Sequence, residues 1–490
     1  MKCGSWITIL FLISLLSTAI YPQTITDALR LGNTGIGSSA RALGMGNSYI
    51  GLSDDASAGF FNPAGFGLLK KLEFSGGLDY SNFSNDAVLN SNGSPIGQSN
   101  NNSTSSTRLD RVSFAFPFPT LRGSLVFGLS YQNTKDLNGA LSFNGYNKNS
   151  SFIQFLTLNG NSLPYQLGLS SHLKDAQGNI RKDTTILNGN LNQSGSILNS
   201  GGINNWTFSG AIEIYKNLFV GLNMNFISGT FESNNDYYED DVNHVYNGVL
   251  ADTSDPNTLN FKTFYLNRLT HWDLSGWDAK FGILYQFNRY SRFGLTVQFP
   301  KTYTIKESFT VNGSGQFQNY TYNLNSADFS DKVQYDIITP FEIGAGFSFN
   351  IKGLILSAQG TLIDYSQLKF ENPDGIDAVT VADLNKSIQN DLTAVVNYNF
   401  GAEYTIPNAG LRVRAGYFVQ PSAYKGDPVS FDKKYFTAGI GFLADEAIGF
   451  DLAFAHGWYS DLGDNYGSNL SRTTQDIKEN HFILTGTYRF

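Results

Sequence analysis

Hydrophobic and polar residues alternate with a period of two along most of this chain. Leu125, Phe127, Leu129 and Tyr131, for example, are separated by smaller or polar neighbours, and the pattern recurs many times. Such alternation predicts strands that are apolar on one face only. It predicts about fourteen strands, at 72–80, 108–117, 123–132, 205–215, 218–231, 273–287, 292–309, 334–349, 353–369, 393–405, 411–421, 433–443, 447–458 and 480–490.

The connections between these strands alternate in length. Short ones, such as 216–217 and 350–352, are followed by long polar ones, such as 133–204 and 232–272. An even number of strands with short turns at one end and long loops at the other is typical of bacterial outer-membrane barrels, whose short turns face the periplasm. We therefore expect an all-β fold, a transmembrane antiparallel β-barrel. One loop is expected to carry a short helix at 376–390.

Both ends of the chain agree with export to an outer membrane. Lys2 and the uncharged apolar run 6–20 predict a cleaved secretory signal peptide over 1–23, too short to cross a bilayer as a helix. The sole cysteine, Cys3, precedes that run and so is not placed for lipid attachment. At the other end the chain stops on an aromatic-x-Phe pattern, Tyr488 and Phe490, which resembles the signal read by the outer-membrane assembly machinery.

Composition narrows the possible partners. The chain has 50 Gly, 39 Phe and 26 Tyr in 490 residues, with only 15% charged, which suits strands that face lipid on one side. A formal net charge of −8 argues against nucleic acid as a partner. We expect a monomer surrounded by outer-membrane lipid and lipopolysaccharide. The histidines show no metal-ligand spacing and we find no nucleophile motif, so we expect no enzyme, cofactor or metal site.

Residues 24–71 differ from the rest of the chain. They are rich in glycine and small residues, which suit a tight and irregular backbone better than a lipid-facing strand. Because they lie between the signal peptide and the barrel, we expect them to plug the lumen. The expected organisation is therefore a signal peptide (1–23), an N-terminal hatch (24–71) and a transmembrane β-barrel (72–490).

The stretch 40–65, ARALGMGNSYIGLSDDASAGFFNPAG, looks like the N-terminal hatch of the FadL/TodX outer-membrane transport family. Segments 276–285 and 292–296 resemble that family's central hairpin, and Thr339-Pro340 and 414–417 resemble later strands. The resemblance implies a 14-stranded barrel that takes up long-chain fatty acids or other hydrophobic compounds. It further implies that the hatch moves to release the ligand through a lateral opening beside an inward kink of the third strand.

The resemblance assigns hatch and gating roles to five residues: Asn62, Pro63, Ala64, Asp54 and Asp55. The alternative is that Asn62-Pro63-Ala64 is an ordinary turn and that the two aspartates cap backbone groups. The expected third strand contains Gly123 and Gly128, which would permit a bend there.

A carboxylate ligand would need a cation in the lumen. Alternation places Lys280, Arg412 and Arg414 on inward faces, where they are candidates to bind such a head group. The alternative is that luminal charges neutralise one another. In the loop 232–272, the acidic run 239–241 is a candidate for Ca²⁺ or, more simply, for a solvated loop.

Two other functions fit the same architecture. A PorV-type barrel of the type 9 secretion system would bind secreted protein cargo through its long loops. A general porin would have an open, water-filled lumen, which an N-terminal hatch argues against.

Overall fold

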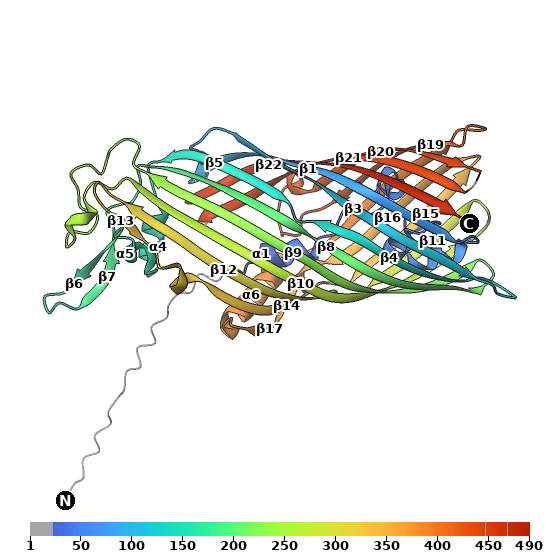
Figure 1. Cartoon of the computed structure of the whole chain (residues 1–490), viewed down its shortest axis with the longest axis horizontal. Helices are drawn as coiled ribbons and strands as arrows, with labels where there is room; N and C mark the ends of the chain where they lie inside the picture. Colours follow the sequence, from blue (N-terminus) through green and yellow to red (C-terminus); the bar gives the residue numbers. More distant parts are fainter. Residues whose placement is uncertain (1–22, 446, 468) are drawn as a thin grey trace, which may run out of the picture.

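The computed structural model describes residues 23–490 except 446 and 468. They form one long barrel whose wall is a single antiparallel sheet (Figure 1). The last strand, β22, pairs with the first, β1, from Glu73 opposite Arg489 to Asn90 opposite Arg472, so the sheet closes on itself. The expected fold class is confirmed, with 14 wall strands. The expected signal peptide lies, apart from Gln23, outside the described residues.

The wall is built from seventeen strand segments, because three of its strands are interrupted. The segments are β1 (Glu73–Ser91), β3 (Asn100–Phe118), β4 (Leu125–Asp136) with β5 (Gly139–Asn147), β8 (Leu191–Tyr215), β9 (Leu218–Asp240), β10 (Thr263–Gln286), β11 (Ser291–Gln298) with β12 (Thr302–Gln316), β14 (Asp331–Ile338) with β15 (Glu342–Ile351), β16 (Leu354–Asp364), β18 (Ala394–Thr405), β19 (Leu411–Gln420), β20 (Lys433–Ala444), β21 (Ile448–Tyr466) and β22 (Ser471–Arg489).

The remaining elements lie in the loops and at the N-terminus. The short strands are β2 (Ser94–Pro95), β6 (Ser171–Lys174), β7 (Ile180–Thr184), β13 (Thr321–Asn323) and β17 (Lys369–Asp374). The helices are α1 (Ile25–Gly32), α2 (Ala40–Gly44), α3 (Ala58–Phe61), α4 (Phe152–Leu158), α5 (Leu163–Gln166) and α6 (Ala378–Asp391), with 3-10 turns η1 (Pro63–Leu68), η2 (Pro256–Thr258), η3 (Ser326–Phe329), η4 (Tyr365–Gln367) and η5 (Val429–Phe431). The helix expected at 376–390 is α6.

Several segments expected as loops continue the wall strands. β8 and β9 run for 25 and 23 residues, so much of 133–204 and part of 232–272 is strand. Similarly, β1 and β3 occupy most of the expected loop 81–107. In these extensions the outer face carries Ser, Thr and Asn, which removes the alternation of hydrophobicity that revealed the strands, although β1 stays paired with β3 and β8 with β9.

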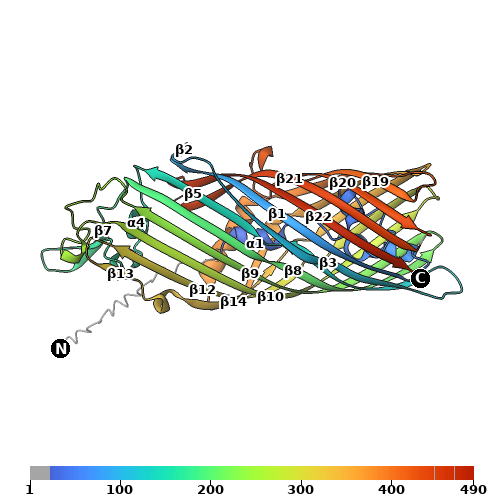
Figure 2. The ribbon, with the colours of Figure 1, turned by 45° about the horizontal axis from the view of Figure 1, so that its top comes forward.

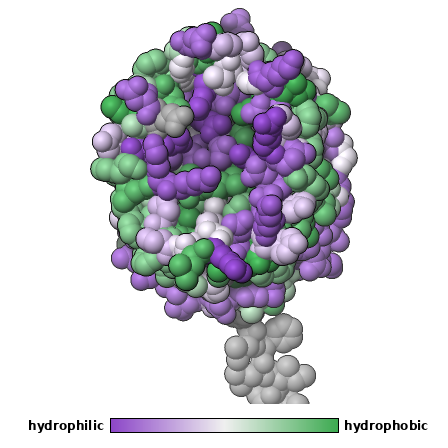
Figure 3. All heavy atoms as spheres, turned by 90° about the vertical axis from the view of Figure 1, so that its right-hand side faces the viewer, coloured by the Kyte–Doolittle hydropathy of each residue, from purple (hydrophilic) through white to green (hydrophobic). Residues whose placement is uncertain are grey.

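A band of exposed apolar side chains surrounds the barrel nearer its short-turn end. On β10, Trp277, Phe281 and Tyr285 face outward, whereas His271 and Asp273 follow on the same face towards the long loops. Figure 3 views the short-turn end: hydrophobic residues gather on the flanks, and hydrophilic residues gather in the recessed centre. An apolar outer band on a closed barrel is the arrangement that a bilayer requires. Among the described residues no helix is long and apolar enough to cross a bilayer.

Residues 23–71, hereafter the luminal segment, lie inside the barrel, as the blue elements in Figures 1 and 2 show. Their backbone packs directly against glycines on the inner wall, where a side chain would not fit. A Cβ built on Gly416 would fall 2.1 Å from the backbone nitrogen of Gly46. The same close approach occurs at Gly221 with Pro63, Gly282 with Asn62, Gly294 with Ile50, Gly346 with Gly51 and Gly401 with Met45.

These contacts predict that the wall positions must be glycine because a side chain there would overlap the luminal segment. Gly416→Val places carbon atoms inside the backbone of the luminal segment and should destabilise the folded barrel by about 1–3 kcal/mol or more. Gly76→Val is the matched control, because a Cβ there meets nothing nearer than 3.7 Å. In thermal unfolding of the purified variants, the midpoint temperature should fall clearly for Gly416→Val and change little for Gly76→Val. Equal midpoints for the two variants would contradict the assignment.

Candidate functional site

The Asn62-Pro63-Ala64 turn attaches the luminal segment to the wall. Asn62 Oδ1 accepts from Ala64 N at 3.1 Å and so caps η1, while its Nδ2 donates to the carbonyls of Ile50 and Ile283, each at 3.0 Å. Ile283 belongs to β10, so one amide side chain joins two parts of the luminal segment and a wall strand. The turn is therefore more than a local reversal of the chain.

Asp54 and Asp55 have separate roles. Asp54 bridges Arg41, within the luminal segment, to Arg292 on β11, at 2.6 and 2.9 Å. Asp55 accepts from the backbone N–H of Ser57 at 2.9 Å and from the Tyr49 hydroxyl at 2.5 Å. Asp55 thus fits the capping alternative, whereas Asp54 is an ionic link to the wall.

A buried ion-pair network extends this link across the lumen. Glu403 on β18 accepts from Arg41 at 3.0 Å and from Arg414 on β19 at 2.6 Å. Arg414 also pairs with Asp451 at 2.7 Å, and its side chain is 0% exposed. Because Arg414 is sealed between two carboxylates, it has no free face for a ligand. Arg412 borders a small cavity that Arg41 also lines. At Arg414 the alternative that luminal charges pair with one another applies.

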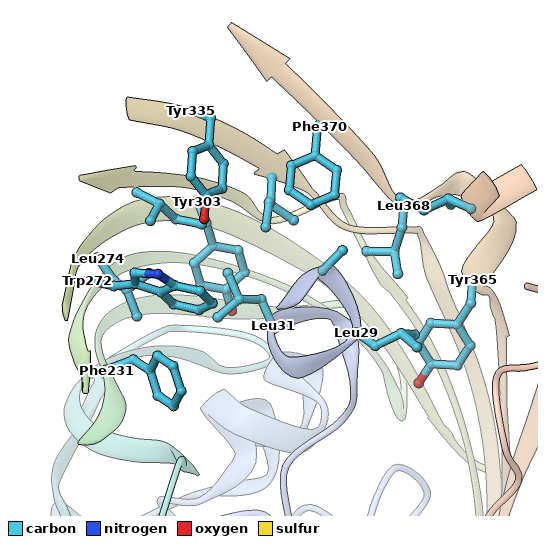
Figure 4. Packing of buried hydrophobic residues seen from close by; sticks show 14 of the residues in the cluster. Leu29, Leu31, Phe231, Trp272, Leu274, Tyr303, Tyr335, Tyr365, Leu368 and Phe370 are labelled. Atoms are coloured by element: carbon cyan, nitrogen blue, oxygen red, sulfur yellow. The ribbon is translucent and has the colours of Figure 1, made fainter. Parts of the chain in front are cut away.

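Helix α1 fills the lumen nearer the long-loop end. Leu29 and Leu31 pack into an apolar cluster whose wall residues come from several strands and from β17 and η4 (Figure 4). Trp272 and Phe231 lie on one side of the helix and Phe370 on another. Arg30 lies over the Phe231 ring, with 4.3 Å between its Cζ and the ring centroid. The cluster holds α1 through apolar contacts, in contrast to the ion-paired residues below it.

Lys135 fixes the C-terminal end of α1. Its Nζ donates to the carbonyls of Arg30 and Leu31 at 2.6 and 3.3 Å. A cation at a helix C-terminus interacts favourably with the helix dipole and with unpaired carbonyls. Lys135 lies where the β4–β8 register shifts, between Asn133 and Lys135. The position of α1 is thus tied to the irregular end of β4.

A polar cavity of about 120 Å³ lies between α1, the rest of the luminal segment and the wall. Lys280 lines it and donates from Nζ to the Phe60 carbonyl at 2.5 Å. Lys301 and Glu342, also lining it, pair at 2.9 Å. Asp278 Oδ2 is buried there and has no hydrogen-bond partner among the described residues. Ile50, Phe60 and Phe418 also line this cavity, so charged and apolar side chains share it.

The hydrogen-bonded ladder of the wall is incomplete between the second and third strands. β3 pairs with β4 only from Phe118–Leu125 up to Arg111–Gln132. Beyond that point, within the described chain, β3 pairs only with β1, and β5 pairs only with β8. The interval closes again at the top, where a Cβ built on Gly97 would fall 1.9 Å from the Asn144 carbonyl oxygen. We call this interval the window.

One ion pair crosses the window. Arg108 on β3 pairs with Asp136 on β4, and Asp136 also accepts from the hydroxyls of Ser81 and Ser106, at 2.6 and 3.4 Å. Behind the window, Leu137 belongs to the same apolar cluster as α1. Side-chain contacts therefore replace the backbone ladder where the wall lies next to α1.

The irregularity of the third strand lies elsewhere than expected. Gly123 is in the turn before β4, with φ of +70°. Gly128 is in regular register, opposite Ala115 and Ser209, and its missing side chain makes room for Phe66, since a Cβ would fall 2.6 Å from that ring. The strand instead breaks at 137–138, between β4 and β5. The sequence predicts the irregularity of the third strand at Gly123 and Gly128, whereas the structure places it at the upper end of β4.

The long-loop end has its own apolar core, with a carboxylate inside. Glu239, 0% exposed, accepts from Phe152 N at 2.6 Å and Ile153 N at 3.3 Å, at the start of α4. Gln193 and Tyr237 also donate to it, at 2.7 and 3.0 Å. The acidic run 239–241 is therefore neither a solvated loop nor arranged for Ca²⁺ at Glu239. Burial raises the pKa of Glu239 to about 7, although these hydrogen bonds act in the opposite direction.

Tyr488 and Phe490 end the closing strand. Both face outward and are exposed, and their rings meet edge to face with centroids 4.5 Å apart. Phe490 N donates to the Leu72 carbonyl at 2.9 Å, which joins the chain end to the start of the barrel. Their role as an assembly signal stays a prediction.

Comparison with solved structures identifies the fold. A Pseudomonas aeruginosa FadL homologue superposes with a TM-score of 0.55 at 12% identity, covering 94% of this chain and 98% of its own. The Pseudomonas putida toluene transporter TodX gives 0.53 at 12% over 93% and 98%, and the Ralstonia pickettii toluene transporter TbuX gives 0.51 at 15% over 93% and 98%. No family model and no curated protein matches the sequence. The chain thus has the FadL/TodX fold, as the resemblance implied.

The ion network predicts a large effect from one amide substitution. Glu403→Gln leaves Arg41 and Arg414 without their shared charge, and breaking a buried pair costs about 3–5 kcal/mol. Glu371→Gln is the control, since Glu371 pairs with Lys369 on the exposed surface, where a pair contributes about 0–1 kcal/mol. In thermal unfolding, Glu403→Gln should have a clearly lower midpoint temperature than Glu371→Gln. A midpoint for Glu403→Gln as high as that of the control would contradict the role of the network.

The raised pKa of Glu239 predicts that the stability of the folded barrel depends on pH. Glu239 has a pKa of about 7 in the folded protein against an ordinary value of 4.5, so it favours the folded state most below pH 4.5. That contribution, about 3 kcal/mol at most, is lost as the pH rises through 7. Relative to Glu239→Gln, the wild type should therefore lose stability between pH 4.5 and 8 in denaturant unfolding. A difference that stays constant with pH would show that Glu239 does not titrate in this range.

Proposed function

We propose that this protein is an outer-membrane transporter for hydrophobic compounds, long-chain fatty acids among them, which it releases sideways through the window between β3 and β4. The observation that carries the proposal is the interruption of the wall ladder above Arg111–Gln132, beside a lumen whose lower part is filled. The toluene transporters that share the fold support the same class of cargo.

A location in the outer membrane is supported by the outer surface of the barrel, because its apolar band matches a bilayer. Short turns of such barrels face the periplasm, so the long loops with α4 and α5 face the outside. No step in this arrangement needs a chemical reaction, and we propose no enzymatic activity.

Sideways release suits both the cargo and the lumen. An apolar molecule that entered the cavity near Lys280 would meet the charges of Lys301 and Glu342, and the floor around Glu403 is ion-paired. The window instead adjoins the apolar cluster of α1, which includes Leu137. Its lower edge lies near the outward-facing Tyr131 and Trp206, side chains typical of a membrane interface. Cargo leaving there reaches lipid without crossing water.

Opening then requires two changes. The Arg108–Asp136 pair must separate, and α1 must move away from its place behind the window. Lys135 connects these events, because it holds the end of α1 and directly precedes Asp136. The residues around Asn62 and Asp54 keep the lower part of the luminal segment in place while α1 moves.

Cross-linking the window tests this route. In a Cys3→Ser background, Ser106→Cys with Asp136→Cys places two thiols across the window. Linking them with a short bismaleimide should stop entry of a fluorescent fatty acid into vesicles containing the protein, because the wall can no longer part. The unlinked variant should still transport the probe.

A matched pair controls for cross-linking itself. Ser75 and Ser113 face each other where β1 and β3 are fully paired, with hydroxyls 2.8 Å apart. A link between cysteines at 75 and 113 should leave entry unchanged. Continued entry through a barrel linked at 106 and 136 would rule out the window as the exit.

A further inference from the structure

The end of the barrel with the short turns, which faces the viewer in Figure 3, carries six exposed basic side chains. Among the side chains that the structure describes, none of the six forms an ion pair or donates a hydrogen bond to another group. We call them the rim cations: Lys70, Lys71, Arg122, Lys216, Arg289 and Lys352.

The rim cations follow one another around the barrel. Lys70 and Lys71 directly precede β1, and the next four turns of this end each contain one cation, Arg122 (β3–β4), Lys216 (β8–β9), Arg289 (β10–β11) and Lys352 (β15–β16). The strands that these turns connect are consecutive in the wall. The remaining turns, 406–410 and 445–447, contain no Lys or Arg. The cations therefore line one arc of the rim, from β1 to β16.

Each of the four turn cations has an exposed apolar neighbour in the sequence. These neighbours are Leu121, Tyr215, Tyr290 and Ile351. Arg289 lies over the ring beside it, with 4.6 Å between its Cζ and the centroid of Tyr290. A cation next to an apolar or aromatic side chain is typical of a membrane interface, where the apolar group contacts acyl chains and the cation reaches the head groups.

The turn cations lie where the apolar band ends. On β10 the outward Tyr285 is followed by the exposed Phe287, and Arg289 comes two residues later. At about 3.3 Å per residue, Arg289 lies within about 7 Å of Phe287 along the chain. A head-group layer is about 5–7 Å deep, so Arg289 falls at its level. At its other end the same strand continues through His271 to Thr263, which places the long loops further from the hydrocarbon.

In the part of the chain that the structure describes, no carboxylate pairs with a rim cation. Glu73 pairs with Arg489 at 2.8 Å, and Glu213 accepts from Asn217 N at 2.7 Å. Asp445 is exposed but lies in a turn without cations. The whole chain has a formal net charge of −8, so the excess of cations is local to this arc. A row of cations beside a membrane attracts the anionic head groups of that membrane.

We propose that the rim cations bind the phosphate groups of anionic phospholipids in the leaflet that the short turns face, while their apolar neighbours contact the acyl chains. Lys and Arg form charge-assisted hydrogen bonds with phosphate oxygens. A zwitterionic lipid carries its own cation beside the phosphate, which competes with the protein, so anionic lipids are favoured. The proposal concerns the lipid around the barrel and not its cargo, so it goes beyond the proposed function and does not rest on the window.

The test compares two lipids on the purified full chain. Native mass spectrometry in a non-ionic detergent, with equal amounts of phosphatidylglycerol and phosphatidylcholine of the same acyl chains, measures how much of each lipid is retained. The wild type should retain phosphatidylglycerol at least about fivefold more, since one Lys or Arg near an anionic surface contributes about that factor. The fourfold variant Arg122→Gln, Lys216→Gln, Arg289→Gln, Lys352→Gln should lose most of this preference.

A variant with the same change in charge controls for the electrostatics of the whole protein. Lys148, Lys174, Lys182 and Lys332 are exposed at the long-loop end and form no ion pair among the described residues. Changing all four to Gln alters the net charge by the same amount as the rim variant. This long-loop variant should keep the wild-type preference.

A preference that survives in the folded rim variant would overturn the proposal. Its equal loss in the long-loop variant would also overturn it, because net charge alone would then explain the preference. Equal retention of the two lipids by the wild type would do the same and would leave the transport proposal untouched. Displacement of the retained lipid by inorganic phosphate at matched ionic strength would contradict a lipid site, because the cations would then recognise phosphate alone.

A smaller change keeps the test decisive if the fourfold rim variant does not fold. Arg122→Gln with Lys216→Gln should retain less phosphatidylglycerol relative to phosphatidylcholine than Lys148→Gln with Lys174→Gln does. An equal ratio in these two double variants would contradict the role of the rim cations.

Discussion

The contact on which the rest of the structure depends is that between the backbone of the luminal segment and the glycine-bearing inner face of the wall. Gly416 against Gly46 and Gly346 against Gly51 bring two backbones within van der Waals distance, with no side chain between them. Close packing of this kind excludes water and transmits any displacement. Asn62 and Asp54 add specific polar links at the same level. The lower lumen is therefore a floor, fixed relative to the wall.

Above the floor, the restraints differ in kind. Helix α1 is held mainly by apolar contacts with residues such as Trp272 and Phe370 and by Lys135 at its end. Apolar packing is non-directional and adapts more readily than a buried ion pair. The backbone hydrogen bonding of the wall is also interrupted here, because the Arg108–Asp136 contact takes the place of strand pairing in the window. A fixed floor below a less constrained helix, beside an interrupted wall, is the arrangement on which the proposed sideways release rests.

The features of this arrangement that a single physical rule determines could be predicted from the sequence. Alternation located all the wall strands in the lipid band, because lipid on one face and the lumen on the other impose a period of two. The motifs that carried the family resemblance meet in space: Asn62 lies against Gly282 and Gly294 of the hairpin, and Gly46 against Gly416. They are recognisable because close backbone contact allows so few residue types there.

Features that depend on pairing across distant strands could not be read in this way. The strand extensions beyond the lipid band lose the regular alternation because their outer faces are polar and their inner faces carry polar as well as apolar residues. Arg414 faces inward, but the carboxylates that pair with it, Glu403 and Asp451, follow from strand register and not from sequence spacing. The same holds for the window, whose position is set by where β3 and β4 cease to pair.

We propose that the luminal segment closes the barrel to water and ions while an apolar route remains at the wall. Single-channel recording in a planar bilayer tests this closure directly, because a barrel of this size without a floor would conduct ions freely. We expect no steady conductance from the wild-type protein under conditions in which it admits a fatty acid to vesicles. A large and stable conductance in the wild type would show that the lumen is an open pore and that the luminal segment does not close it.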